Sequence, residues 1–199
     1  MGNVKFGTDG WRAVISEDFT FDNVKVVAQA ISDYVRSQKT GIRKRKSELY
    51  GKKYAIVVGY DTRFLSEKYA ELVSCVLAAN GIRVLLASGP APTPSVSFCI
   101  RRNNFLGGVM ITASHNPARY NGIKYKGHFG GSVGRDVTDR MESKLYKSKV
   151  RSMSVREAEE KGLLKFSDIV RPHLDAVKKF TRRSLLKNTG FKVLIDSMH

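Results

Sequence analysis

The chain alternates between short apolar runs and amphipathic segments, and this alternation limits the folds that it can adopt. Apolar runs of this length are typical of buried strands. They occupy residues 54–59, 82–87, 106–112 and 122–126. Helical segments separate the first three runs, which favours parallel pairing, whereas the short link before the fourth favours one antiparallel strand. The order predicts an α/β fold, a three-layer α/β/α sandwich with a mixed, mostly parallel four-stranded sheet and helices on both faces.

Three helices are predicted beside these strands, and residues with known end preferences mark their limits. They span residues 21–38, 66–80 and 93–103. In the first, apolar residues recur every three or four positions, and either Thr20 or Asp22 is a suitable N-cap. Gly81 is a typical C-terminal residue for the second helix. Pro94 suits the first turn of the third.

The pattern changes after Gly134, which suggests a different unit. Helices are predicted near 137–145, 155–160 and 169–186, followed by a strand at 191–196. We expect a first domain at 1–150, a helical connection at 151–190 and the first strand of a truncated second domain at 191–199. A domain seldom stops on the first strand of a new unit, so we expect this chain to be a fragment.

The chain is strongly basic, with a formal net charge of +17, and Arg43–Lys46 form a continuous cationic run. Such runs can bind nucleic acid. However, no aromatic residues alternate with this one, as a single-strand-binding surface requires, and no helix-turn-helix or zinc-finger spacing is present. We interpret the run as a solvated loop and expect no nucleic-acid partner. A basic nucleic-acid-binding α/β module remains the alternative from a different class.

Apolar patterning also bears on the compartment. No apolar stretch approaches the roughly 20 residues that span a bilayer, and the N-terminus lacks the apolar core of a signal peptide. Cys75 and Cys99 each lie within an apolar pattern, which favours packed free thiols over a disulfide or a metal pair. We therefore expect a cytoplasmic protein with no membrane partner.

The hexapeptide Thr112–Pro117 places a hydroxyl where a buried strand breaks into a loop. Asn116 precedes a proline, which forces the chain out of the helical region and predicts a turn. Ser114 would then lie on a loop held by a rigid strand, an arrangement that suits covalent group transfer. His115 beside it can donate or accept a proton near neutral pH. A serine that only hydrogen-bonds its own turn is the structural alternative.

Four further segments accompany the serine loop: Phe6–Arg12, Val57–Arg63, Tyr120–Lys124 and Gly127–Ser132. In this order and spacing, they and the hexapeptide resemble the α-D-phosphohexomutase superfamily, the phosphoglucomutases and phosphomannomutases. The resemblance covers residues 1 to about 150 well and the remainder loosely. It implies that residues 1–150 are domain I of such an enzyme. The glycine-rich last segment on its own is more typical of a flexible turn than of a phosphate cradle.

The resemblance implies phosphoryl transfer through a phosphoserine, which corresponds here to Ser114. The serine would pass its phosphoryl group to a sugar monophosphate, and the bisphosphate formed would return its other phosphate. The planar fork of Arg12 can bind phosphate oxygens. Lys124 is a candidate acid, base or charge stabiliser. His115 is open to a role in proton relay or in anchoring the loop.

Phosphate binding is also expected from the opening loop. Thr8 and Gly10 would shape the loop that presents Arg12, and together with Lys124 they complete the predicted phosphate-binding set. Asp61 and Arg63 either brace the site or form an ordinary surface ion pair.

The resemblance further implies Mg²⁺, held by an aspartate-rich loop of the second domain and by one oxygen of the phosphoserine. This sequence contains no Asp-x-Asp-x-Asp cluster, so Ser114 could contribute a metal ligand only through its phosphate. The implied partners are a phosphosugar, a sugar bisphosphate and the missing C-terminal domains of the same chain. Glucose and mannose phosphates are the expected substrates. Glucosamine phosphate is the alternative within the same superfamily. The 199-residue fragment is expected to be inactive alone.

Overall fold

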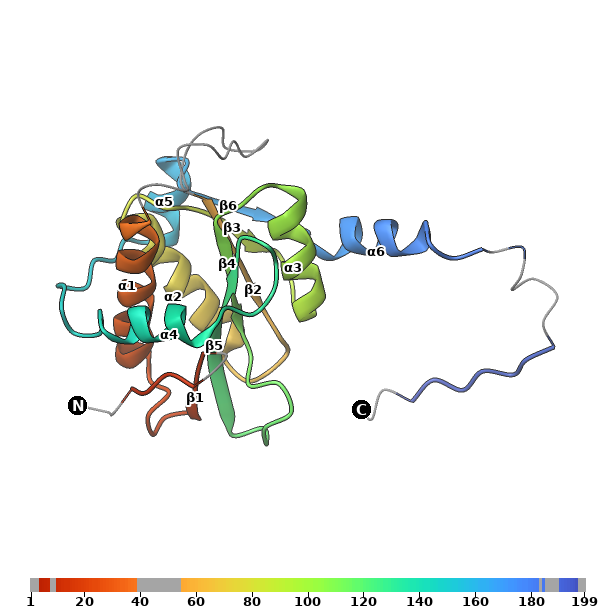
Figure 1. The fold of residues 1–199 in the computed structure, drawn as a ribbon, viewed down its shortest axis with the longest axis horizontal. Helices are drawn as coiled ribbons and strands as arrows, with labels where there is room; N and C mark the ends of the chain where they lie inside the picture. The colour runs from red at the N-terminus through yellow and green to blue at the C-terminus, as the bar shows by residue number, and fades with distance from the viewer. Residues whose placement is uncertain (1–3, 8–9, 39–54, 183, 185–189, 197–199) are drawn as a thin grey trace.

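A computed structural model describes residues 4–7, 10–38, 55–182, 184 and 190–196. Its centre is a six-stranded sheet with the strand order β1-β5-β4-β2-β3-β6 (Figure 1). The strands are β1 (Trp11–Val14), β2 (Ala55–Tyr60), β3 (Arg83–Ala87), β4 (Gly107–Ile111), β5 (Tyr120–Gly127) and β6 (Leu164–Ser167). The mixed α/β sandwich predicted from the sequence is confirmed, but the predicted number of four strands is wrong.

Strand direction follows from the length of each connection. β2 pairs in parallel with both β3 and β4, and β3 pairs in parallel with β6, because helices carry the chain back across the sheet between them. β5 pairs antiparallel with both β4 and β1. A loop without a helix joins β4 to β5, which accounts for the antiparallel direction of this pair, as predicted.

Helices cover both faces of the sheet (Figure 1). They are α1 (Phe21–Ser37), α2 (Ser66–Ala79), α3 (Thr93–Arg102), α4 (Arg135–Glu142), α5 (Val155–Glu160) and α6 (Val170–Lys178). The helices α1 and α2 lie together on one face, with α4 against α1 and α5 against α2, while α3 covers the other face and contacts α6. Of the helices in the described ranges, none combines the length and apolar character that crossing a bilayer requires.

Local sequence signals locate several helix ends correctly. Of the two candidate N-caps of α1, Thr20 has this role, because its side chain accepts a hydrogen bond from the Asn23 amide at 3.3 Å, whereas Asp22 lies in the first turn of the helix. Gly81, with a φ of 76°, follows the C-cap of α2, and a proline stands in the first turn of α3. Both cysteines are buried, and burial raises the pKa of each thiol to about 11. The basic run at 43–46 lies outside the described residues.

The two strands that the sequence analysis missed are the edges of the sheet. A loop is expected to present Arg12, yet Trp11 and Arg12 begin β1, and β6 follows α5. Each of these strands has four residues, which is too short for a period-of-two pattern to be recognised. Their strand geometry depends on pairing with β5 and β3, which are distant in the sequence.

The C-terminal part differs from its prediction in two respects. The helix expected over 169–186 ends at Lys178, and no strand forms at 191–196. Leu174, Val177 and Phe180 are 45%, 48% and 89% exposed, so packing against the rest of the described chain does not extend the helix. Residues 191–196 pair with no strand of the described chain. The division at 150 and 190 stays a prediction.

A buried aromatic cluster ties β1 to α2. Phe19 is completely buried, stacks on Trp11 with ring centres 4.8 Å apart and meets the Tyr69 ring edge-on at 4.7 Å. The Tyr69 hydroxyl donates to the Phe19 carbonyl at 3.1 Å. Burial raises the pKa of the Tyr69 hydroxyl further above neutral pH. Trp11 is therefore a packed anchor, and it directs its neighbour Arg12 to the opposite face of β1.

Removing the Phe19 ring should destabilise the fold strongly. We expect Phe19→Ala to lower the free energy of unfolding by about 3–5 kcal/mol, because the cavity left beside Trp11 and Tyr69 cannot close fully. Phe64, which is 69% exposed, provides the matched control. Phe64→Ala should change the free energy of unfolding by less than about 0.5 kcal/mol. Urea denaturation followed by circular dichroism measures both. Equal effects of the two substitutions would contradict the proposed core.

Candidate active site

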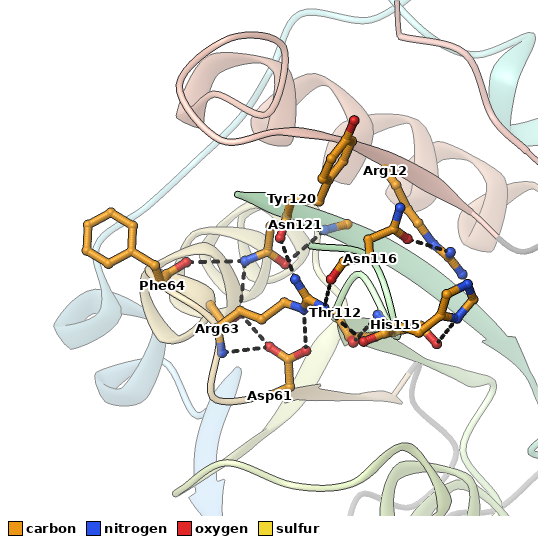
Figure 2. Close-up of polar contacts among 12 residues, drawn as sticks. Arg12, Asp61, Arg63, Phe64, Thr112, His115, Asn116, Tyr120 and Asn121 are labelled. Carbon is orange, nitrogen blue, oxygen red and sulfur yellow. Dashed lines mark hydrogen bonds and ion pairs between the residues drawn. The ribbon is translucent and has the colours of Figure 1, made fainter. Parts of the chain in front are cut away.

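The predicted serine loop lies at the carboxyl end of β4, between β4 and β5 (Figure 2). Ser114 is exposed and has a φ of 59°, in the left-handed region that non-glycine residues seldom adopt. Its amide donates to Thr112 Oγ1 at 2.9 Å, and the Asn116 amide donates to the Ala113 carbonyl at 3.1 Å. These bonds close a tight turn that leaves the serine side chain on its outer surface. The hydroxyl is accessible at the edge where open α/β sheets bind ligands.

His115 lies beside this hydroxyl. Its Nδ1 is 3.4 Å from Ser114 Oγ, and the ring is exposed (Figure 2). This distance is at the long end for a hydrogen bond. The direction of any proton exchange depends on the ring tautomer. The geometry accommodates both roles considered for His115.

Arg12 reaches the serine loop from the neighbouring strand. Its Nη1 donates to Asn116 Oδ1 at 2.9 Å, two residues after the serine (Figure 2). Arg12 lies opposite Gly122 in the β1–β5 pairing. A Cβ at Gly122 would lie 2.8 Å from Arg12 Cγ, so the glycine makes room for the arginine stem. Ser114 and Arg12 are thus at the same end of the strands, the end at which β4 runs into the serine loop.

Lys124 lies further inside the sheet than the other predicted residues. It pairs with Met110 in the β4–β5 ladder and is 9% exposed. Lys124 and Gly122 are two positions apart, so their side-chain positions are on the same face of β5, which Arg12 also shares. Thr8 lies outside the described residues.

Gly10 brings the opening loop close to β5. Its φ is 129°, and a Cβ there would overlap the Ile123 carbonyl oxygen. Only glycine satisfies both conditions without strain. The expectation that Gly10 shapes the segment before Arg12 therefore has a structural basis.

Asp61 and Arg63 form a pair within the site. Arg63 Nε lies 3.3 Å from Asp61 Oδ2, and the side chains of Arg63 and Asp61 are only 14% and 24% exposed. The guanidinium lies against the backbone of the serine loop (Figure 2). Of the two interpretations that the sequence allowed, these contacts match a brace rather than a surface ion pair.

Sequence reasoning did not identify two asparagines of this site. Asn116 was interpreted only as a turn residue, although its side chain accepts the bond from Arg12. Asn121 is fully buried and donates to Ser66 Oγ at 2.9 Å. The Asn-Pro and Asn-Gly pairs are ordinary turn signals, and nothing in them reveals the distant partners.

The serine lies on an open surface of the described chain. A cavity of about 270 Å³ is lined in part by Tyr34, Tyr125 and Phe129. Gly127 also lines this cavity and pairs with Gly107 at the start of β4. The cavity therefore lies at the opposite end of the strands from Ser114. Among the residues that the structure describes, no three His, Cys, Asp or Glu side chains are grouped as metal ligands.

Comparison with known proteins places this arrangement in a family. Residues 3–151 match the family model described as phosphoglucomutase/phosphomannomutase, alpha/beta/alpha domain I. The matched segment includes the serine loop and all six residues predicted for the site. The resemblance inferred from the motifs is therefore confirmed.

Individual relatives carry different names. A phosphoglucosamine/phosphogalactosamine mutase of Sulfurisphaera tokodaii is 28% identical over 98% of this chain and 39% of its own length. A phosphoglucomutase of Staphylococcus epidermidis is 41% identical over 46% of this chain and 17% of its own length. A crystal structure from Thermus thermophilus, assigned as a phosphomannomutase, has 31% identity and a TM-score of 0.78, covering 94% of this chain and 38% of that one. The chain thus spans less than half the length of these proteins.

The conformation of Gly10 generates a prediction about the loop before β1. Gly10→Ala should lower the free energy of unfolding by about 2–4 kcal/mol, because the added Cβ meets both a disfavoured φ and the Ile123 carbonyl. At Gly89 an added Cβ meets nothing within 4 Å, so Gly89→Ala should stay within about 1 kcal/mol of wild type. Thermal denaturation measures both variants. A Gly10→Ala protein as stable as Gly89→Ala would contradict this loop geometry.

Proposed function

The chain belongs to the phosphoglucomutase/phosphomannomutase family, and from this premise we propose that it is the phosphoserine-bearing domain of a phosphohexose mutase. The whole protein interconverts the 1-phosphate and 6-phosphate of a hexose. The observation that carries the proposal is the exposed Ser114 hydroxyl, on a braced loop at the carboxyl end of β4, with Arg12 at the same edge.

Ser114 is the residue that carries the phosphoryl group. Transfer breaks the bond between phosphorus and Ser114 Oγ and forms a bond to the unphosphorylated hydroxyl of the sugar monophosphate. That hydroxyl loses its proton, and the product is a sugar bisphosphate. The bisphosphate reorients and returns its other phosphoryl group to Ser114, so the serine is phosphorylated again at the end of the cycle. Such transfer depends mainly on positioning and charge neutralisation.

The surrounding residues supply those two requirements. Arg12 binds phosphate oxygens, since its bond to Asn116 holds the guanidinium beside the serine loop. Lys124, within the sheet, either stabilises charge as an ammonium or takes part in proton transfer, and Gly10, with Thr8, shapes the approach to Arg12. The proton released by the sugar needs an acceptor. His115, with Nδ1 at 3.4 Å from Ser114 Oγ, and Lys124 are the candidates.

Magnesium belongs to the proposal only through the family resemblance. The described residues contain no cluster of metal-ligating side chains, so they do not by themselves fit a metal site. In the whole protein the Ser114 phosphate would supply one oxygen ligand, and carboxylates outside this chain would supply the rest.

Two substrate classes are compatible with the relatives. The phosphoglucomutase match favours glucose phosphate and the structure assigned as a phosphomannomutase favours mannose phosphate, whereas the relative matched over 98% of this chain is named for glucosamine and galactosamine phosphates. We propose glucose and mannose phosphates as substrates and retain glucosamine phosphate as the second candidate. A coupled assay that offers each sugar 1-phosphate in turn to the whole protein distinguishes them.

Removing the serine hydroxyl should abolish turnover. In the whole protein, assayed with magnesium and a catalytic amount of sugar bisphosphate, Ser114→Ala should lower kcat by at least about 10⁴-fold, because the phosphoryl acceptor is gone. Ser16 is the matched control, since it is also exposed with a positive φ of 69°, and Ser16→Ala should keep wild-type activity.

Two outcomes would refute this assignment. One is unchanged turnover in whole-protein Ser114→Ala. The other is robust mutase activity in the purified 199-residue chain, which offers no carboxylate cage among its described residues.

Arg12 should contribute positive charge to the phosphoryl-transfer step, and Ser114 should remain the group that is phosphorylated. Arg12→Ala should slow turnover by about 10²–10³-fold, because a charged donor to the transferring phosphoryl group is lost, yet Ser114 should still become phosphorylated. Mutase kinetics and intact mass measurement provide the two readouts. An Arg12→Ala protein with normal kcat/KM would exclude a role for this guanidinium in phosphate binding.

A further inference from the structure

Arg63 makes an unusual number of contacts with the backbone of the serine loop (Figure 2). Its two terminal nitrogens donate four hydrogen bonds to backbone carbonyl oxygens, three in this loop and one at the start of β5. From Nη2 they reach Ser114 at 2.8 Å and Asn116 at 2.6 Å, and from Nη1 they reach Pro117 at 2.9 Å and Tyr120 at 3.0 Å. The remaining N–H group, on Nε, faces Asp61 Oδ2 at 3.3 Å. A guanidinium has five N–H donors, and four of them are hydrogen-bonded to backbone carbonyls while the fifth belongs to the ion pair with Asp61.

We propose that Arg63, oriented by Asp61, is a positioning residue that sets the direction of the Ser114 hydroxyl and does not itself bind the phosphosugar. This inference rests on the proposed function, because it assigns Arg63 a role in phosphoryl transfer through Ser114. It goes beyond that function by separating two arginines at the same edge of the sheet. Arg12 is assigned to phosphate binding, whereas Arg63 is assigned to the loop.

The left-handed conformation of Ser114 explains why such a brace is needed. A φ of 59° is unfavourable for an L-residue and persists only where the surroundings hold it. The Ser114 amide is held by Thr112 Oγ1 at 2.9 Å, and its carbonyl is held by Arg63 Nη2 at 2.8 Å. With both backbone groups of the residue fixed, the direction of its Cα–Cβ bond is fixed as well.

Electrostatics requires a cation at this position. Four carbonyl oxygens point toward one place, and each carries partial negative charge. Without a positive group between them they would repel one another and open the turn. The delocalised guanidinium offsets this repulsion and meets the oxygens in a planar fork. A lysine ammonium has the charge but only three donors from a single point.

Asp61 fixes Arg63 to the rigid part of the fold. Asp61 Oδ1 accepts bonds from the Arg63 amide at 3.0 Å and from Ser66 Oγ at 2.8 Å. Ser66, which is 1% exposed, also accepts from Asn121 Nδ2 at 2.9 Å, and Asn121 Oδ1 accepts from the Gly122 amide at 2.8 Å. The end of β2, the start of α2 and β5 therefore all contribute to holding the serine loop.

The test has a structural arm that uses the 199-residue chain. Arg63→Lys keeps the charge and loses the fork, so hydrogen exchange of backbone amides in 112–121 should become at least about tenfold faster, while α5 and α2 keep wild-type rates. The matched control is Arg156→Lys, because Arg156 also pairs with a carboxylate, Glu160 at 2.8 Å, but lies on the distant α5. Exchange in 112–121 at the wild-type rate in Arg63→Lys would overturn the proposal, and so would uniformly faster exchange throughout the sheet.

The kinetic arm uses the whole protein. Arg63→Lys should lower kcat about 100-fold and change KM by less than about threefold, because a misdirected nucleophile affects the transfer step rather than substrate binding. Arg63→Ala should recover part of its turnover when guanidinium ions are added. A raised KM with normal kcat would show that Arg63 binds substrate and would overturn the proposal.

The two arms separate this inference from the proposed function. If the wild-type protein showed no mutase turnover, the proposed function would fail, and the exchange rates of 112–121 would still decide whether Arg63 holds the loop. Should Arg63→Ala fail to fold, Arg63→Lys and Asp61→Asn carry the test, since Asp61→Asn should also accelerate exchange in 112–121 by removing the charge that orients Arg63.

Discussion

The two ends of the serine loop are joined by the antiparallel pairing of β4 with β5. In this register Ile111 lies opposite Ile123, and the Thr112 amide donates to the Gly122 carbonyl at 2.9 Å. A buried parallel strand, β2, supports β4 from its other side, so the start of the loop is rigid. The same β5 residues receive β1, which brings Arg12 opposite Gly122. One pairing thus places the serine loop and Arg12 at the same end of the strands.

Within this frame, two arginines contact the loop in different ways. Arg12 donates to the side chain of Asn116, whereas Arg63 donates to backbone carbonyls and pairs with Asp61. A loop held through its backbone would keep its shape if the charge on Ser114 changed, as the proposed phosphoryl transfer requires. These contacts hold Ser114 in its left-handed backbone conformation, which is unfavourable for a residue other than glycine.

The sequence predicted the elements whose signals are local. The helix at 155–160 matches its expected limits, and Thr20 caps α1 by a bond within four residues. Prediction failed where structure depends on distant partners. The edge strand β1 exists because β5 pairs with it, and the expected strand at 191–196 pairs with no strand of the described chain. For the site, Ser114 could be proposed from its motif, but the contacts of Arg63 join segments more than 50 residues apart and could not be derived from spacing.

The central claim is that Ser114 carries the phosphoryl group, and phosphopeptide mapping tests it most directly. The whole protein would be incubated with isotopically labelled sugar bisphosphate, digested and sequenced by mass spectrometry. The account predicts a single labelled site, Ser114, and loss of the label when unlabelled sugar monophosphate is added. Label on a different residue, or label on Ser114 that no sugar monophosphate can remove, would contradict it.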